Sequence, residues 1–320
     1  MTRTAPHLEP PRYLEGRRLL ELLPPMEALR AIQRFFAGHG PESVVAPERI
    51  HLRVPGRETV GLYMPSATRE YVGVKIVHLM PSRYPSVEAE IFLYDAETGR
   101  LLFWGDGKPL TGLRTAAVSC AASLRLKPDC RRLLVYGAGI QAAAHIVAFA
   151  AAYPMLEDIR AAARSAESFR RLQGLLPAEL AGRVTPSAEP AADLAAADCA
   201  IATTPAPEPL FRWKEVPAGC HLVGIGSATP EMNELPPAAF REAEAWVDTR
   251  DTLRESGDLH AAQRNGWSEA ELAGDLFALL AEPPPRPGPK RARATLFKSA
   301  GHAAQDLPLL IRLWEAMQEA

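Results

Sequence analysis

The period of hydrophobic and polar positions changes once along the chain, near Thr111. Before it, apolar residues recur at helical spacing through 25–39 and then form runs that predict strands in 49–65, 71–81 and 88–107. The first of these runs, RIHLRVPGRETVGLYMP, turns at a Pro-Gly pair as a hairpin does. The first third of the chain therefore predicts a helical segment followed by antiparallel strands.

Beyond Thr111, apolar runs and amphipathic segments alternate. A helix rich in small residues is predicted over 111–127. Further strands are predicted at 131–137, 158–164, 198–204, 221–226 and 245–249, and further helices at 140–153 and 165–176, the latter with Ser165 as its N-cap. Such alternation with apolar strands is typical of a doubly wound parallel sheet in an α/β protein. The last stretch, 295–317, ends in an amphipathic helix that we expect to pack back on the first part of the chain.

Composition narrows the class of protein. The 320 residues are enough for two domains, and 47% hydrophobic with 23% charged residues is usual for a globular chain. A net charge of −2 gives no electrostatic reason to expect a nucleic-acid or membrane partner. The four cysteines form no CxxC pair, which argues against a disulfide framework or a metal site. No apolar signal-peptide core is present near the start, so we expect a cytoplasmic protein.

A glycine-rich turn lies between a predicted strand and a predicted helix. In LLVYGAGIQAAAH, Gly137 permits the tight turn, Gly139 allows a pyrophosphate to approach the backbone, and Ala142 keeps helix and strand close. Ile140 and Gln141 open the helix, whose N-terminus would face the phosphates. A glycine turn without a ligand is the simpler interpretation, but the strand–turn–helix context favours a dinucleotide site.

The end of the next strand bears on which dinucleotide binds. An NAD site usually has an acidic residue there for the ribose hydroxyls, whereas this chain has Arg164 and Ser165. A guanidinium and a hydroxyl suit a 2′-phosphate, so NADP(H) is favoured and NAD(H) is possible. An exposed charge at a strand end is the simpler interpretation of Arg164. Thr203 and Thr204 are expected to end a strand beside the cofactor.

Five segments in order, PLTGLRTAAVS, VYGAGIQA, IATTPAPEPLF, GIGSATPEMNEL and FKSAGHAAQDL, resemble the ornithine cyclodeaminase/mu-crystallin family. The resemblance runs from about Arg49 to Asp306. It implies a homodimer in which a Rossmann domain, residues 114–298, is inserted into an α+β domain for substrate binding and dimerisation, residues 1–113 plus 299–320. Members include ornithine cyclodeaminases, archaeal alanine dehydrogenases, reductases of cyclic ketimines, and mu-crystallins that bind thyroid hormone with NADPH.

The resemblance also implies a clamp for a substrate carboxylate, made of Arg49, Lys75 and Arg114. A 2-imino or 2-amino carboxylate must be held with its C2 over the nicotinamide, which arginine forks and a lysine can do. Each residue taken alone is more often a solvated surface charge. Lys75 differs because it stands in an apolar strand and needs a partner or a function there, so we assign it the catalytic position. Around this clamp we expect Ala228 and Gly301 at the substrate and Thr115, Gly226 and Ser227 at the cofactor.

The chain departs from the cyclodeaminase branch at three positions. A glutamate ahead of the LMP turn is Leu62 here, an aspartate of the GGDCP-like loop is Ala228, and an asparagine after the lysine strand is Arg83. Cyclisation of ornithine needs acids because amines lose protons, attack an imine and leave as ammonia. A cyclic imine can instead bind already protonated, and hydride addition then neutralises it. Any further proton could come from Lys75 or a bound water.

These departures favour NAD(P)H-dependent reduction of 1-pyrroline-2-carboxylate or 1-piperideine-2-carboxylate to L-proline or L-pipecolate. The alternatives are ornithine cyclodeaminase, an amino-acid or opine-type dehydrogenase, and a mu-crystallin-like binding protein. The sequence leaves open the ring size of the substrate, the physiological direction, and whether the proline-rich loop at 283–293 covers the site.

Three other polar residues are given roles by their positions. His302 is a candidate contact to substrate or nicotinamide. Glu234 precedes LPPAAF and is expected at a helix start, where a negative charge is favourable. Asp306 is expected to cap the last helix, or alternatively to orient Lys298 or Ser299.

Overall fold

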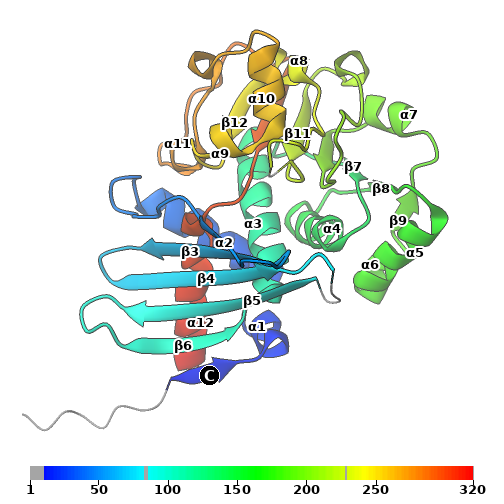
Figure 1. Ribbon diagram of the computed structural model, residues 1–320. Coiled ribbons are helices and arrows are strands. Elements are labelled where there is room, and N and C mark those ends of the chain that lie inside the picture. Colours follow the sequence, from blue (N-terminus) through cyan, green and yellow to red (C-terminus); the bar gives the residue numbers. More distant parts are fainter. Residues whose placement is uncertain (1–10, 83–85, 228, 320) are drawn as a thin grey trace, which may run out of the picture.

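Two β-sheets organise the chain (Figure 1). This computed structural model describes residues 11–82, 86–227 and 229–319. The first sheet has the order β1-β6-β5-β4-β3-β2, with β2 to β6 antiparallel and β1 parallel to β6. The second has the order β12-β13-β11-β10-β7-β8-β9, with every neighbouring pair parallel. The expected α/β class with a doubly wound parallel sheet is confirmed.

The strands and helices have the following bounds. The first sheet contains β1 (Arg12–Leu14), β2 (Ile50–Arg53), β3 (Val60–Ala67), β4 (Tyr71–Leu79), β5 (Val87–Asp95) and β6 (Leu101–Asp106). The second contains β7 (Arg132–Tyr136), β8 (Asp158–Ala162), β9 (Val184–Pro186), β10 (Cys199–Ala202), β11 (Cys220–Gly224), β12 (Glu244–Val247) and β13 (Ala294–Lys298). The helices are α1 (Gly16–Leu22), α2 (Pro25–Gly38), α3 (Lys108–Leu126), α4 (Ile140–Ala152), α5 (Ala166–Leu175), α6 (Ala178–Ala181), α7 (Pro190–Ala195), α8 (Pro237–Glu242), α9 (Thr252–Glu255), α10 (Gly257–Arg264), α11 (Leu276–Leu280) and α12 (Leu307–Glu319), with short 3-10 helices η1 (Trp213–Glu215), η2 (Glu269–Glu271) and η3 (Ala303–Gln305).

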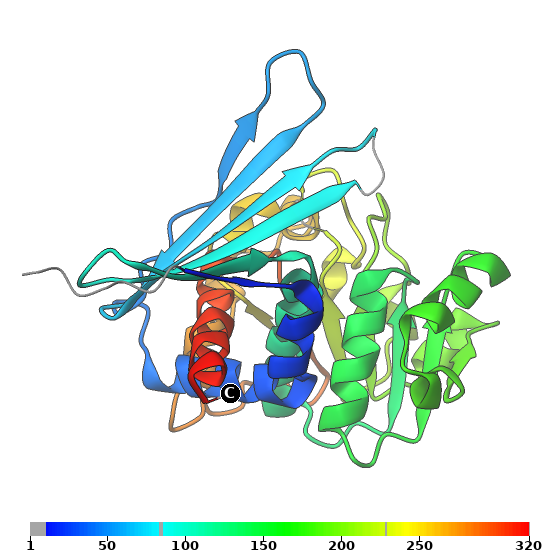
Figure 2. The ribbon, with the colours of Figure 1, turned by 90° about the horizontal axis from the view of Figure 1, so that it is seen from below.

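Helices α1, α2 and α12 lie on one side of the first sheet, and no helix of the described residues covers its other side (Figure 2). The predicted apolar face of α2 is buried, including Ile32 and Phe36. The last helix, α12, returns to pack on α2, β4 and β5, as expected. A Cβ added at Gly73 of β4 would lie 2.9 Å from side-chain carbons of Leu307 and Leu310, so this glycine lets the helix approach the strand closely.

Helix α3 connects the two sheets, because it contacts β5 of the first and β11 and β13 of the second. Its small residues allow close packing on α4: a Cβ added at Gly112 would lie 3.4 Å from Cγ2 of Ile140. The domain division at 113/114 and 298/299 stays a prediction. The second boundary coincides with the end of β13, whereas the first falls inside α3.

The order of the second sheet creates a crevice between β7 and β10. From β7 the chain extends the sheet through β8 and β9, then crosses back to place β10 on the other side of β7. Ligands of doubly wound sheets bind at the carboxyl ends of the strands where the order reverses.

Strand β13 was not predicted, although it is buried throughout and lies between β11 and β12. A run of only five residues ending in lysine does not distinguish a strand from the approach to a helix.

The proline-rich loop at 283–293 lies at the amino ends of the strands of this sheet, whereas the crevice lies at their carboxyl ends. The backbone N–H of Gly219, before β11, donates to the carbonyl of Arg293, and the side chain of Arg291 pairs with Glu244 at the start of β12. These are the amino ends of the strands, so the loop does not reach the carboxyl ends. No helix in the described part of the chain is long and apolar enough to cross a membrane.

Candidate active site

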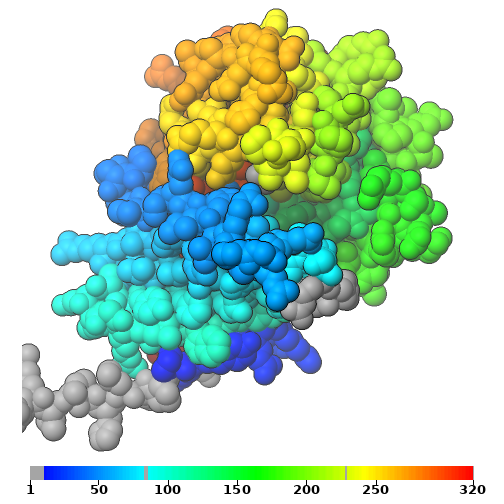
Figure 3. Space-filling view, viewed as in Figure 1, coloured from blue at the N-terminus to red at the C-terminus, as the bar shows by residue number. Residues whose placement is uncertain are grey.

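A cleft of about 290 Å³ opens at the carboxyl ends of β10 and β11, and the surface is hollowed between the blue-to-cyan and yellow-green parts of the chain (Figure 3). It brings together the segments that follow β10, β11 and β13 with the beginnings of α3 and α4. Sequence-predicted residues in its lining are Arg114, Thr115, Gln141, Thr203, Thr204, Gly226 and Gly301, and the lining is completed by Thr111, Pro205, Ile225, Ser299 and Ala300.

The glycine turn has the backbone that its sequence predicts. Gly137 has φ +121°, and a Cβ there would lie 2.5 Å from Oγ1 of Thr203, so a side chain would collide. A Cβ on Gly139 would meet no atom within 4 Å, which leaves open space above the backbone where α4 begins. The Oε1 atom of Gln141 is buried without a hydrogen-bond partner among the described residues. Open space, a helix N-terminus and an orphaned polar atom fit a bound dinucleotide.

Residues at the turn and at the end of β8 do not line the cleft. Arg164 is exposed, and the hydroxyl of Ser165 accepts a hydrogen bond from the backbone N–H of Ser168 at 3.1 Å. The predicted N-cap of α5 is therefore confirmed. The side chain of Ile140 is exposed at the start of α4. The binding roles assigned to these residues stay predictions.

Lys75 and Arg114 meet at one carboxylate. Lys75 lies in the middle of β4 and is 1% exposed, and its Nζ donates to Oδ1 of Asp306 at 2.7 Å. Nε of Arg114 lies 3.3 Å from the same oxygen. Burial, followed by the charge of Arg114, lowers the pKa of Lys75 to about 8, an effect that Asp306 only partly offsets. A buried amine at this pKa can hold or release a proton near neutral pH.

Both roles expected for Asp306 are wrong. Its carboxylate pairs with Lys75 and Arg114, and Ser299 is instead held by Asp248. Asp306 does precede α12, but there its backbone carbonyl accepts from Leu309 and Leu310 while the side chain points to the clamp. A buried lysine and arginine need a counter-charge more than a helix end needs a cap.

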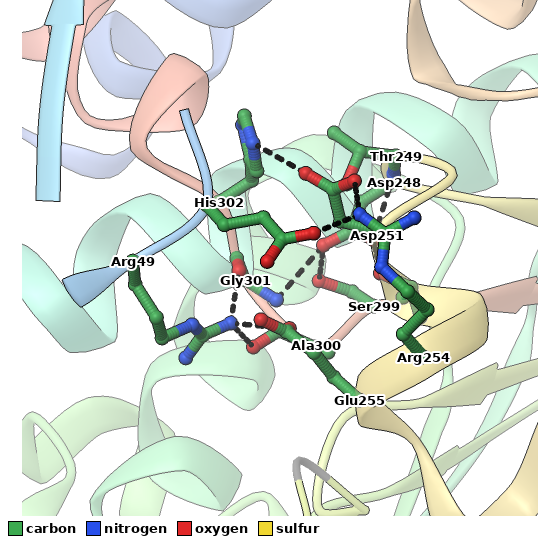
Figure 4. A network of polar contacts seen from close by, with 12 residues as sticks. Arg49, Asp248, Thr249, Asp251, Arg254, Glu255, Ser299, Ala300, Gly301 and His302 are labelled. Atoms are coloured by element: carbon green, nitrogen blue, oxygen red, sulfur yellow. Dashed lines mark hydrogen bonds and ion pairs between the residues drawn. The ribbon is translucent and has the colours of Figure 1, made fainter. Parts of the chain in front are cut away.

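Arg49, in the segment before β2, binds the backbone of residues that line the cleft (Figure 4). Its Nη2 donates to Oε2 of Glu255 at 2.7 Å and to the carbonyls of Ala300 at 3.0 Å and Gly301 at 2.5 Å. Among described residues, Nη2 makes all the hydrogen bonds of this guanidinium, so Nε and Nη1 are left for a ligand. Burial raises the pKa of Glu255, and Arg49 counteracts that effect.

Gly301 lies directly against Arg114. Its φ is +85°, and an added Cβ would be 2.7 Å from Nη2 and 2.8 Å from Nη1 of that arginine. Any side chain at this position would therefore displace the guanidinium. Nη1 of Arg114 also donates to Oε1 of Gln305 at 2.6 Å.

Glu234 is the main correction in the loop after β11. It is fully buried, and α8 begins only at Pro237, so a helix-start role is wrong. Its carboxylate accepts from the backbone N–H groups of Thr204 at 2.9 Å, Gly226 at 2.5 Å and Ser227 at 3.3 Å. It thereby joins the ends of β10 and β11 at the back of the cleft. Sequence spacing carried no signal for this contact, because a polar loop residue is usually solvated.

Several other predicted positions can be placed. The hydroxyl of Ser227 is buried and donates to the carbonyl of Met232, so it does not face the cleft. Ala228 and Arg83 lie outside the described residues. His302 does not line the cleft, since its Nε2 lies 3.2 Å from Oδ2 of Asp251 and its Nδ1 accepts from Ala304. Within the described ranges, no group of three or more His, Cys, Asp or Glu residues could hold a metal ion.

Leu62 lies on the same face of the first sheet as Lys75. Met64 pairs with Lys75 and Leu62 pairs with Val77 across β3 and β4, and alternate residues of a strand share a face. A carboxylate at position 62 would thus point to the side that carries the clamp. In this chain the position carries the apolar side chain of Leu62.

Comparisons with known proteins identify the family. The model of the "Ornithine cyclodeaminase/mu-crystallin family" matches residues 16–320. Ketimine reductase mu-crystallin of Mus musculus is 32% identical over 296 residues, covering 89% of this chain and 88% of that protein. The Delta(1)-pyrroline-2-carboxylate/Delta(1)-piperideine-2-carboxylate reductase of Azospirillum brasilense is 32% identical over 292 residues, 87% of each chain.

Solved structures share the fold. The Delta(1)-pyrroline-2-carboxylate reductase of Thermococcus litoralis, solved with NADH and L-proline, has a TM-score of 0.86 at 24% identity and covers 96% of this chain and 97% of that one. A probable ornithine cyclodeaminase of Bordetella pertussis has a TM-score of 0.82 at 25% identity and covers 97% of this chain and 98% of its own. The protein belongs to the ornithine cyclodeaminase/mu-crystallin family.

Proposed function

We propose that the protein is an NAD(P)H-dependent reductase of cyclic ketimine carboxylates, which converts 1-pyrroline-2-carboxylate or 1-piperideine-2-carboxylate to L-proline or L-pipecolate. The observation that carries the proposal is a cluster of three cations at the cleft: Arg114 lines it, Lys75 shares Asp306 with Arg114, and Arg49 binds the carbonyl of Gly301 in its lining. The curated relatives of similar length, which bear reductase names, support the same reaction class.

The charges of the clamp favour a substrate with one carboxylate. Three cations are paired with two carboxylates, Asp306 and Glu255, which leaves a net charge of +1. One substrate carboxylate would neutralise the cluster, and arginine forks bind carboxylates with two parallel hydrogen bonds. A dicarboxylate would leave an excess negative charge in a largely buried place, which is costly.

The proposed chemistry places few demands on the chain. A bound dinucleotide would supply the hydride. The clamp holds the substrate carboxylate and thereby orients the ring, and the buried Lys75 keeps a proton available beside it. Hydride addition to a protonated imine removes the positive charge from the ring nitrogen, so no carboxylate base is required. The apolar side chain of Leu62 is compatible with this reaction and not with an acid–base role at that position.

Mixing the protein with NADPH or NADH and each imine tests the proposal directly. We expect loss of absorbance at the nicotinamide band with at least one imine. Absence of turnover with both ring sizes would refute reduction. Release of ammonia from L-ornithine with catalytic NAD⁺ would support the cyclodeaminase alternative, and oxidation of a linear amino acid would support a dehydrogenase. Tight NADPH binding without any turnover would support a binding protein.

We further propose a homodimer formed through the side of the first sheet that carries no helix. Large apolar side chains are exposed on this sheet, among them Ile50, Leu52 and Trp104. Exposed apolar patches of this kind mark interaction sites. Sedimentation of the purified protein would give twice the chain mass, and a monomer at micromolar concentration would refute the dimer.

The four cysteines are free and buried, which supports the proposed cytoplasmic location.

A further inference from the structure

Asp248 follows β12 and is fully buried behind the substrate end of the cleft (Figure 4). Its Oδ2 accepts three hydrogen bonds: from Oγ of Ser299 at 2.7 Å, from the backbone N–H of Gly301 at 2.8 Å and from Nε2 of Gln305 at 2.8 Å. Its Oδ1 accepts from the backbone N–H of Thr249 at 2.8 Å. A single carboxylate therefore fixes the segment that follows β13.

Two of these three contacts continue to the arginines of the clamp. Gln305 receives Nη1 of Arg114 on its Oε1 while its Nε2 donates to Asp248, so the orientation of the amide is fixed from both ends. The backbone N–H of Gly301 donates to Asp248, and the carbonyl of Gly301 accepts from Nη2 of Arg49. Both connections cross from the second sheet to residues that approach the cleft from other parts of the chain.

We propose that Asp248 is a positioning residue that fixes Arg114 through Gln305 and Arg49 through Gly301, and so aligns the clamp for the substrate carboxylate. The inference rests on the proposed function, because it takes the carboxylate as the ligand of these arginines. Asp248 itself touches neither cleft nor clamp, so its effect passes through its two neighbours.

The state of Asp248 agrees with this role. Burial alone would raise the pKa of Asp248, but hydrogen bonds from Thr252, Ser299, Gly301 and Gln305 hold it below its ordinary value. The carboxylate is therefore an acceptor on both oxygens. An acceptor of this kind forces the amide of Gln305 to present its oxygen, and not its nitrogen, to the guanidinium.

The decisive experiment reverses the polarity of the chain Asp248–Gln305–Arg114. Gln305→Glu places a second carboxylate against that of Asp248, and the two repel each other. We therefore expect KM for the imine to rise on the order of tenfold or more. Asp248→Asn alone gives a smaller rise. In the double variant, the amide introduced at position 248 can donate to the carboxylate introduced at position 305. That carboxylate still accepts from Arg114, so KM should recover the part of the loss that passes through Arg114, although the N–H of Gly301 loses its acceptor. A purely structural role predicts that the two losses add.

Asp258→Asn provides the matched control, because Asp258 is an equally buried carboxylate that does not touch the clamp. Combined with Gln305→Glu it should give no recovery. NADPH dissociation constants, measured by fluorescence, should stay within about twofold in the Asp248 and Gln305 variants, since the contacts of Asp248 do not reach the glycine turn. Additive losses in the double variant, or equal recovery with Asp258→Asn, would overturn the inference.

Gln305→Met covers the case in which a charged variant fails to fold, because it cuts the chain without adding a charge. We expect it to raise KM severalfold, and an unchanged KM would refute the role of Gln305. Calorimetric binding of pyrrole-2-carboxylate, a flat carboxylate probe, separates this inference from the proposed function. If wild-type protein reduces neither imine, the proposed function fails. The probe then still reports whether the variants weaken and restore carboxylate binding.

Discussion

Two buried lysines occupy opposite situations in this protein. Lys75 of β4 and Lys298 at the end of β13 are each at most 1% exposed, and each pairs with an aspartate. Around Lys75, two cations share the single carboxylate of Asp306. Around Lys298, one cation faces two carboxylates: its Nζ lies 3.3 Å from Oδ2 of Asp258 and 3.9 Å from Oε1 of Glu234.

The excess charges are satisfied by different means. The negative excess at Lys298 is met within the chain, because Asp258 accepts backbone N–H groups from Glu234 at 2.7 Å and Leu235 at 3.0 Å, and Glu234 accepts three more. At Lys75, the neutral amide of Gln305 accepts from Arg114, but among the described residues no second carboxylate pairs with either cation. A buried positive excess beside a cleft indicates an anionic ligand, whereas a self-satisfied cluster indicates a support.

The largest expected effect comes from replacing Lys75, the lysine of the ligand-binding cluster. Lys75→Met should lower kcat/KM for the imine on the order of a thousandfold, because it removes the charge that completes the clamp. Folding should be little affected, since Arg114 still neutralises Asp306. Steady-state kinetics together with denaturant unfolding would show the split. A small kinetic effect would mean that Lys75 is only structural.

The next largest effect comes from replacing Lys298, the lysine of the supporting cluster. Lys298→Met leaves Glu234 and Asp258 without a counter-ion, so we expect the free energy of unfolding to fall by about 3–5 kcal/mol. Chemical denaturation of both methionine variants measures the difference. Equal destabilisation by Lys75→Met would contradict the division between a ligand-binding cluster and a supporting one.

A pH profile sharpens the assignment of Lys75. Burial lowers the pKa of Lys75 to about 8, so the amine is charged below that pH and neutral above it. We expect kcat/KM to fall as pH rises through about 8, approaching tenfold per pH unit, as the clamp loses its charge. Titration of the imine itself is the control. A profile that is unchanged in Lys75→Arg, whose charge persists, would contradict the assignment.

The smallest effect concerns an exposed cation. Arg164→Ala should weaken NADPH binding by about fivefold more than NADH binding, because an exposed guanidinium contributes little to binding compared with a buried one. Dissociation constants for both dinucleotides give the ratio directly. A ratio equal to that of the wild type would remove the basis for preferring NADP(H).

The sequence predicted local features well and long-range ones poorly. The turn at Gly137 and Gly139, the hairpin of β2 and β3, and the apolar face of α2 follow from patterns within a few residues. Lys75 could be predicted to need a partner, because a charge in an apolar strand is costly. Its partner Asp306 lies 231 positions away, and no spacing rule joins them.

The same limit explains the misjudged acids. Glu234 and Asp306 each stand beside a helix start in sequence, and the local rule predicts capping or a favourable dipole there. Tertiary burial overrides that rule, since each carboxylate is needed by buried donors from elsewhere in the fold. Asp248 gave no signal, because a single acid after a short strand is an ordinary occurrence.

The stretch from Lys298 to Leu307 has a consequence for shortened forms of the protein. It passes in succession from the second sheet, through Gly301, Gln305 and Asp306, into the helix that covers the first sheet. A chain that stopped at Lys298 would still contain the segments of every strand of the parallel sheet and the glycine turn. It would nevertheless lose every residue that fixes Arg114 in place. Loss of this final piece of the chain would therefore remove the partners of Arg114 together with α12, which covers the first sheet, and should abolish substrate binding.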